Sequence, residues 1–320
     1  MRYNLQQFGD IVQAIRKAKG YSYNTLAVEA DIAKNTLRNI ERGKVTPTID
    51  TLSILSNYLD VDLTTLLLTC KTSVYQTYHD LHQNFEQSIS NHNTDNIIQF
   101  MKEAEDLLRQ SVQVTDDPAI HKRLLQLYYR MIGHYETYIK GDDAQALQVF
   151  NRALKVTLPD FQLQQYMDYD YTYEELHILF NIVQMLNRKD KKALHLSMYN
   201  FIYDCYEHLV EKEIYLFPTL VNNMAVTYLN NGDLEQSLKL ANIGLRFVHQ
   251  QQTTIDLPGL LLCKGLVYFY QNNTYADFYI DLSFDLLVLG NRSDIIELAL
   301  KDLKMNHQID YKLKTQPVSS

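Results

Sequence analysis

A group of hydrogen-bond donors lies between residues 34 and 44 of this 320-residue chain, at spacings typical of one face of a helix. Leu37 and Ile40 would face a core, so the polar side chains around them would point outward, and Gly43 would end the helix. Asparagine pairs bidentately with adenine, and arginine and lysine reach guanine edges or phosphates. The pattern predicts a helix in the major groove of DNA, with Lys34, Asn35 and Arg38 chiefly at base edges, Asn39 at the boundary, and Arg42 and Lys44 chiefly at phosphates. A solvated polar face is the alternative for any single residue.

The elements before this helix would position it. The first is an amphipathic helix whose apolar side carries Leu5, Phe8, Ile11, Val12 and Ile15 and whose far side carries Arg16, Lys17 and Lys19. Ser22 would cap a second, short helix, in which Ala27 and Ala30 allow another helix to cross closely. A turn at Asp31 and Ile32 would then lead into the donor-bearing helix.

Two further helices would complete an N-terminal domain. Thr48 would cap a fourth helix through Leu59, and Asp62 would cap a fifth. The five-helix domain would close near Leu68. The next residues, 69–72, are predicted to be a hinge or the start of a connecting helix.

This arrangement resembles the phage-repressor type (XRE, Cro/C1) of helix-turn-helix domain. The resemblance is carried by Ser22–Ala27, Asn35–Lys44 and Pro47–Leu52, and the sequence departs from it at two positions. Tyr23 stands where the family usually has glutamine, and Asp31 stands at the usual turn glycine, where aspartate tolerates a left-handed backbone. The candidate DNA-binding residues are Ser22, Lys34, Asn35, Arg38, Asn39, Arg42 and Lys44.

The charge distribution restricts DNA contact to this domain. The chain has a formal net charge of −8, but residues 1–66 carry eight Lys/Arg and seven Asp/Glu, which leaves −9 for the remainder. An acidic surface repels phosphate, so only the N-terminal part is expected to touch DNA. Three widely spaced cysteines and short apolar runs favour a cytoplasmic protein without a membrane span.

The rest of the chain is predicted to be an all-α array of stacked helical pairs. Polar breaks recur near 91–94, 115–118, 141–143, 159–170, 188–191, 230–233, 253–258, 272–274 and 290–293. Small residues around Gly232 resemble a tetratricopeptide repeat (Ala225, Ser237, Ala241 and Gly244), as do Ala146, Phe150 and Ala153 after Gly141. We therefore expect two domains, a helix-turn-helix domain over 1–70 and a right-handed tetratricopeptide-like repeat domain over 71–320.

The first helix of each pair would form a concave wall that can hold an extended peptide. The repeat register places Asn181, Gln184, Asn222, Asn223, Val226, Cys263, Leu266 and Phe269 on this wall. An asparagine amide offers both a donor and an acceptor to a peptide unit, so Asn181 and Asn223 are the leading ligand residues. Contacts between helices are the alternative. Lys264 and Arg130 could pair with a peptide carboxylate, although an ordinary surface position is favoured for both.

Two other features have competing interpretations. The acidic, aromatic run 166–175 could attract a cationic ligand, but a connecting loop that ends in a capping box from Thr172 to Glu175 is favoured. His79 and His82 have helical spacing, but a surface pair is favoured over a metal site. Because the motifs of phosphate loops, nucleophile elbows and zinc sites are missing from the sequence, we predict no enzymatic activity and no cofactor.

Together the two parts resemble the peptide-responsive quorum-sensing regulators of Gram-positive bacteria, the Rgg/PlcR/PrgX group. The resemblance implies a homodimer that binds a double-stranded DNA operator and a short signalling peptide. Two alternatives stay open. The repeats could bind a protein partner or only dimerise, or the chain could be a peptide-regulated adaptor or phosphatase that does not act through DNA.

Overall fold

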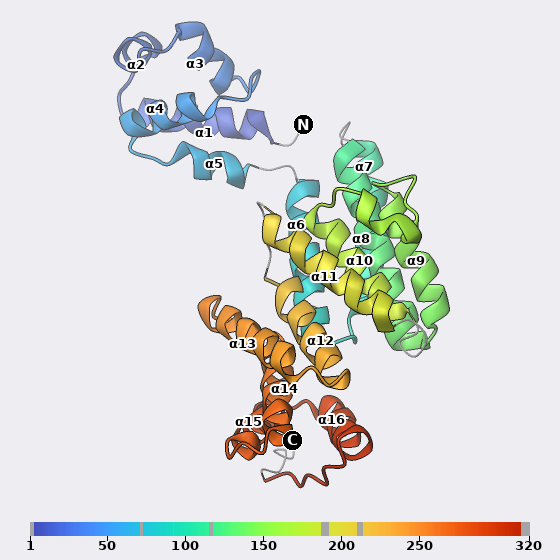
Figure 1. Ribbon diagram of the computed structural model, residues 1–320. Coiled ribbons are helices and arrows are strands. Elements are labelled where there is room, and N and C mark those ends of the chain that lie inside the picture. The colour runs from blue at the N-terminus through green and yellow to red at the C-terminus, as the bar shows by residue number, and fades with distance from the viewer. Residues whose placement is uncertain are drawn as a thin grey trace. The chain divides into compact units, whose positions relative to one another are not determined.

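The computed structural model describes residues 3–70, 73–91, 93–114, 118–186, 192–209 and 214–314, and every element in these ranges is a helix (Figure 1). The all-α prediction is confirmed. The described chain forms two compact units: residues up to 84 with 99–128, and residues 85–98 with those from 129 onward. Residues 71 and 72 of the expected hinge lie outside the described ranges.

Five helices form the N-terminal domain: α1 (Leu5–Ala18), α2 (Tyr23–Glu29), α3 (Lys34–Glu41), α4 (Ile49–Leu59) and α5 (Leu63–Thr69). Each predicted cap accepts a backbone hydrogen bond at its helix start: Ser22 from Thr25, Thr48 from Thr51, and Asp62 from Thr64 and Thr65. Asp31 has a left-handed backbone with φ 50°, as its place at the turn predicts. The local sequence thus sets where these helices begin.

Two glycines allow α1 to lie close against α3 and the turn after it. A Cβ at Gly9 would lie 2.5 Å from the carbonyl oxygen of Glu41, and one at Gly43 would lie 2.6 Å from the backbone nitrogen of Gln6. Gly43 also has φ 63°, which ends α3. Any side chain at Gly9 would push α3 away from α1.

The remaining helices form an array of neighbouring pairs. The α-helices are α6 (Ser73–Ser90), α7 (Ile97–Val114), α8 (Pro118–Tyr135), α9 (Asp143–Lys155), α10 (Tyr173–Met185), α11 (Lys192–His208), α12 (Leu216–Asn230), α13 (Leu234–Gln250), α14 (Leu257–Tyr270), α15 (Ala276–Leu289) and α16 (Ser293–Asn306). A π-helical turn, η1 (Glu136–Lys140), extends α8, and a 3₁₀ helix, η2 (Leu163–Asp168), lies between α9 and α10. The break between α11 and α12 was not among the predicted ones. The predicted breaks at 115–117 and 188–191 lie outside the described residues.

Small residues set the distance between the paired helices, as predicted. Helix α12 packs against both α13 and α14, and α14 packs against α15, so alternate helices lie side by side as in stacked repeats. A Cβ at Gly244 would lie 2.6 Å from a methyl of Leu260, and one at Gly265 would lie 2.7 Å from Ile280. Ala225 and Ala241 are fully buried.

The same turn occurs in two of the repeats. Gly141 and Gly232 both have a left-handed backbone, with φ 68° and 83°. The aspartate that follows each caps the next helix, since Asp142 accepts from Gln145 and Asp233 accepts from Gln236. This Gly-Asp turn is a local sign of the repeat.

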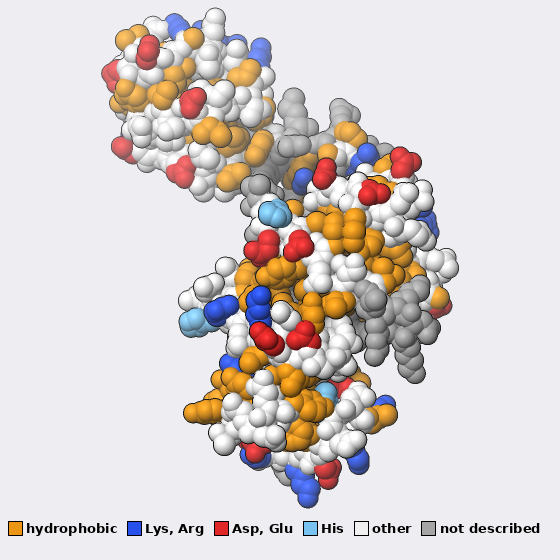
Figure 2. Space-filling model, in the orientation of Figure 1, with side chains coloured by type: hydrophobic (Ala, Val, Ile, Leu, Met, Phe, Trp, Pro, Cys, Tyr) orange, Lys and Arg blue, Asp and Glu red, His pale blue; other side chains and the backbone are white. Residues whose placement is uncertain are grey.

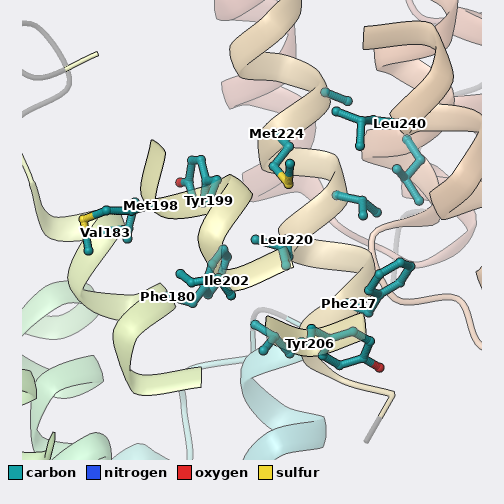
Figure 3. Close-up of a cluster of buried hydrophobic side chains, with 14 of the residues drawn as sticks. Phe180, Val183, Met198, Tyr199, Ile202, Tyr206, Phe217, Leu220, Met224 and Leu240 are labelled. Carbon is teal, nitrogen blue, oxygen red and sulfur yellow. The ribbon is translucent and has the colours of Figure 1, made fainter. Parts of the chain in front are cut away.

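A continuous core joins α10 to α13 (Figure 3). Tyr206 of α11 stacks on Phe217 of α12 with ring centroids 4.9 Å apart, and Phe217 also contacts Phe247 of α13. Large side chains therefore fill the space between successive pairs, while the small residues bring the helices together.

The acidic, aromatic run is a packed connection. Thr172 and Glu175 form the predicted capping box at the start of α10. The Tyr171 hydroxyl donates to the carbonyl of Tyr166 at 2.6 Å, and Tyr169 donates to that of Asp160 at 2.7 Å. These hydrogen bonds support the interpretation as a connecting loop.

Candidate functional site

Helix α3 presents a row of donor side chains. Leu37 and Ile40 are buried, so Lys34, Asn35 and Arg38 are exposed on the opposite face, Asn39 is half-buried, and Arg42 and Lys44 are exposed at the helix end. Within the described part of the chain, no hydrogen bond or ion pair engages the side chains of Lys34, Asn35, Arg38 and Arg42. Figure 2 shows Lys and Arg side chains gathered over this end of the N-terminal domain. The donors are thus free for a ligand.

Arg16 is not one of these free donors, which corrects the prediction that placed it on the outer side of α1. It is buried and forms two hydrogen bonds with Glu41, Nε to Oε1 at 2.6 Å and Nη2 to Oε2 at 2.9 Å. Its remaining nitrogen donates to the carbonyl of Tyr21 at 2.7 Å. The pair ties α1 directly to the last turn of α3.

Tyr23 and Ser22 have structural roles. The Tyr23 ring lies 4.0 Å from the Arg16 guanidinium, so the residue that departs from the family pattern covers the buried ion pair. The Ser22 hydroxyl caps α2 and is hydrogen-bonded to Thr25 Oγ1 at 2.8 Å. Ser22 is exposed, and its contact with DNA stays a prediction.

Three of the predicted wall residues, and Lys264, which was predicted separately as a possible partner of a peptide carboxylate, are buried or are engaged by neighbouring helices. Cys263 and Leu266 are buried in the core, where Cys263 contacts the Ser237 hydroxyl and burial raises the pKa of its thiol to about 11. Lys264 donates to Asn242 of α13 at 2.9 Å and lies 4.5 Å from the ring of Tyr279 on α15. Asn222 contacts the next repeat, as described below. The helical register alone does not distinguish the wall from the faces between helices.

A second group of polar residues lies along alternate helices, and we call it the polar row: His134 of α8, Tyr138 of η1, Asn181 of α10, Asn222 of α12 and Asp256 before α14. The rings of His134 and Tyr138 are stacked, with centroids 5.7 Å apart. Asp256 accepts hydrogen bonds from Thr219 and from Asn222 Nδ2. Two of the predicted residues belong to this group, Asn181 beside His134 and Asn222 beside Asp256.

The polar row contains buried atoms without partners. Asn181 Oδ1, Asn222 Oδ1 and His134 Nε2 are buried and make no short hydrogen bond among the described residues, although the Asn181 side chain is near enough to His134 to raise its pKa as a hydrogen-bond partner. An unpaired buried polar atom costs about 1–3 kcal/mol. The row is therefore not a fully hydrogen-bonded contact between helices.

The other predicted wall residues are less buried. Gln184, Asn223 and Val226 are half-buried, and Phe269 is exposed. Their contact with a peptide stays a prediction. His134, Tyr138 and Asp256 were not predicted, although His134 and Tyr138 are four residues apart, which is a helical spacing.

Beside the row lies a buried ionic cluster around Arg130, which corrects the prediction of a surface cation. Arg130 is fully buried on α8 and pairs with Glu86 of α6 at 2.6 Å and with Glu174 of α10 at 3.0 Å. It also contacts His177 Nδ1 at 3.3 Å. Because the Arg130 guanidinium is buried and paired with these two carboxylates, it is not available to bind an anionic ligand group.

His134 is held neutral. Burial, followed by the positive charge of Arg130 and by His177, lowers its pKa well below the usual 6.5, while the neighbouring Asn181 side chain acts in the opposite direction.

His79 and His82 do not form the expected surface pair, because His79 is exposed and His82 is buried against Tyr78.

The depressed pKa of His134 predicts that acid destabilises the repeat array. The unfolded chain binds a proton at His134 below about pH 6.5 and the folded chain does not, so stability is full above this pH and falls by up to about 1.4 kcal/mol per pH unit below it. His134→Phe should make this dependence shallower. Urea unfolding at pH 7.5 and 5.5 checks the prediction, with His79→Phe as the control at an exposed histidine. Identical slopes in the parent and both variants would show that His134 does not contribute.

Similarity to known proteins defines the class of the N-terminal domain. Residues 12–66 match the helix-turn-helix family, and the five helices described above are its XRE-type domain. An XRE-type domain followed by paired helices is therefore the architecture of this chain. No helix in the described ranges is both long enough and apolar enough to span a membrane.

Particular relatives share the N-terminal domain. The chain is 44% identical over 69 residues to the HTH-type transcriptional regulator SlrR of Bacillus subtilis, which covers 21% of this chain and 45% of SlrR. It is 45% identical over 60 residues to the HTH-type transcriptional regulator SinR of the same organism, which covers 18% of this chain and 54% of SinR. The chain thus spans about half the length of the curated relatives it matches.

Two solved structures share the fold of nearly the whole chain. PlcR of Bacillus thuringiensis, in complex with the peptide PapR7 and DNA, superposes with a TM-score of 0.63 and 16% identity, covering 94% of this chain and 99% of PlcR. ComR of S. thermophilus, in complex with DNA and its signalling peptide ComS, gives a TM-score of 0.55 and 15% identity, covering 94% and 100%.

Proposed function

We propose that this protein is a sequence-specific transcription regulator of the cytoplasm that binds DNA through α3. The observation that carries the proposal is the set of unengaged donors on one exposed face of this helix, while the neighbouring cation Arg16 is buried. SlrR and SinR, which share the domain at 44–45% identity, are both HTH-type transcriptional regulators. The donors match the chemistry of base edges and phosphates.

We further propose that the protein acts as a homodimer on a paired DNA site. Residues 1–66 have only one more basic than acidic residue, which gives a single domain weak attraction for phosphate. One recognition helix also contacts few base pairs, so two linked domains raise affinity and specificity together.

The regulator is proposed to respond to a short peptide bound along the polar row. Buried polar atoms on α8, α10 and α12 that make no short hydrogen bond among the described residues support this, because peptide groups would complete their hydrogen bonds. PlcR and ComR, which share the fold, were each solved with a peptide and DNA.

The DNA-binding proposal is tested by selecting duplexes from a random pool and measuring affinity for the best sequence. Each lost base contact costs about 1–3 kcal/mol, so Asn35→Ala combined with Arg38→Ala should weaken binding by roughly 30-fold or more. Arg42→Ala should weaken binding to all duplexes. It should also reduce the slope of the logarithm of affinity against the logarithm of salt concentration by about one.

Arg109→Ala supplies the control. It also removes one cation, but from the exposed surface of α7, where Arg109 pairs with Glu105. This variant should bind as the parent does. If the double variant binds the selected duplex as tightly as the parent, α3 is not the recognition helix and the proposal is wrong.

A further inference from the structure

Asp256 forms an acidic end to the polar row. It is the N-cap residue of α14 with a left-handed backbone, φ 52°, and its side chain makes no capping hydrogen bond. Thr219 donates to its Oδ2, and Asn222 Nδ2 donates to its Oδ1 at 3.4 Å. Each carboxylate oxygen has more than one acceptor site, so the charge is held in place by α12 and can still accept from a ligand.

Tyr138 of η1 lies within the electrostatic reach of this carboxylate. Burial raises the pKa of the Tyr138 hydroxyl, and the negative charge of Asp256 raises it further. About half of the Tyr138 surface is nevertheless exposed, at 49%. A carboxylate beside an open aromatic ring is an environment that favours a cation over an anion.

The unpartnered oxygens of the row add the same preference. Asn181 is nine-tenths buried or more, at 5% exposed, and its Oδ1 can only accept a hydrogen bond. Asn222 Oδ1 is likewise a buried acceptor without a hydrogen-bond partner in the described part of the chain, and the Asn222 amide nitrogen already donates to Asp256. A ligand that reaches these two oxygens must therefore supply N–H donors.

The cations next to the row are already neutralised. Arg130 is paired with two carboxylates, Glu86 and Glu174. Lys140 follows Tyr138 by two residues, but it pairs with Glu136 at 3.3 Å and lies over the ring of Tyr135. An anionic ligand would find no free partner among these groups.

Resting on the proposed peptide response, we infer that the ligand is a cationic peptide, which places an ammonium or guanidinium group between Asp256 and Tyr138 and donates backbone N–H groups to Asn181 and Asn222. The cation is either the free amino terminus or a lysine or arginine side chain. Both offer the same donor chemistry to the carboxylate.

The inference is tested by peptide capture on the full-length protein. Two pools of random seven-residue peptides are used, one with free amino termini and one N-acetylated, and captured peptides are identified by mass spectrometry. We expect at least tenfold enrichment of Lys- and Arg-containing or free-amino peptides over acidic ones. Loss of enrichment in the acetylated pool identifies the terminus, and retention identifies a side chain.

Three variants locate the site. Asp256→Asn, which tolerates the same backbone, should abolish the enrichment while leaving capture of neutral peptides. Tyr138→Leu should reduce it, and Tyr138→Phe should retain it. Asp233→Asn is the matched control, since Asp233 is an exposed carboxylate that caps α13 and its loss removes the same charge.

The outcomes separate this inference from the proposal on which it rests. Captured peptides that are acidic, or without charge preference, overturn the cationic ligand but keep the peptide response. Enrichment that survives Asp256→Asn also overturns it. If no peptide is captured from either pool, the peptide response itself is wrong and the inference falls with it.

Discussion

Replacing Glu41 by alanine should open the N-terminal domain. The substitution leaves the Arg16 guanidinium buried without its carboxylate, and removing one partner of a buried pair costs about 3–5 kcal/mol. The free energy of unfolding of a folded domain is only about 5–15 kcal/mol. Hydrogen exchange of the full chain should show protection in α1 and α3 falling by roughly two to three orders of magnitude, with α12 to α14 unchanged.

Lys19→Ala is the control for this prediction. Lys19 pairs with Asp60 at 2.6 Å, but both side chains are exposed, so the loss should stay within about 1 kcal/mol. The double variant Arg16→Met with Glu41→Leu should recover most of the protection, because apolar side chains can replace a buried pair. Equal exchange in Glu41→Ala and Lys19→Ala would contradict the prediction.

Replacing Arg130 by methionine should have a comparable effect on the repeat array. Glu86 and Glu174 would then face each other without the guanidinium that lies 2.6 and 3.0 Å from them. We expect a loss of about 3–5 kcal/mol, measured as a lower urea midpoint by tyrosine fluorescence, since the chain has 24 Tyr and no Trp.

The matched change is Arg152→Met on α9. Arg152 is exposed and donates to the Tyr129 hydroxyl at 3.1 Å, so its loss should lower stability by less than about 1 kcal/mol. Arg130→Met combined with Glu86→Gln should be more stable than Arg130→Met alone. If Arg130→Met and Arg152→Met shift the midpoint equally, the buried cluster does not stabilise the array.

The parts of the fold that were predicted depend on short-range patterns. Ser22, Thr48 and Asp62 cap helices through their own neighbours, and the glycines that end helices act through their own backbone. The break between α11 and α12 was missed because residues 209–215 contain no glycine or proline. Local chemistry therefore gave the helices of the first domain and most of the second.

The errors concern residues whose partners are distant in the sequence. Arg16 lies 25 residues from Glu41, and Arg130 lies 44 residues from each of its carboxylates, so both looked like ordinary surface cations. Asn222 is predicted to face a peptide, and the helical register did not show that its amide nitrogen also donates to Asp256 of the next repeat. The polar row depends on how α8, α10, α12 and α14 are stacked, which spacing within one helix does not specify.

The Arg16–Glu41 pair also has a mechanical consequence. It joins the last turn of α3 to α1, and the two helices are in direct backbone contact at Gly9. The helix that carries the free donors therefore moves as one stiff body with its domain. In the proposed homodimer, a signal from the repeat array would change the separation and tilt of two such bodies and leave the shape of each unchanged, so half-site spacing is the quantity on which control would act.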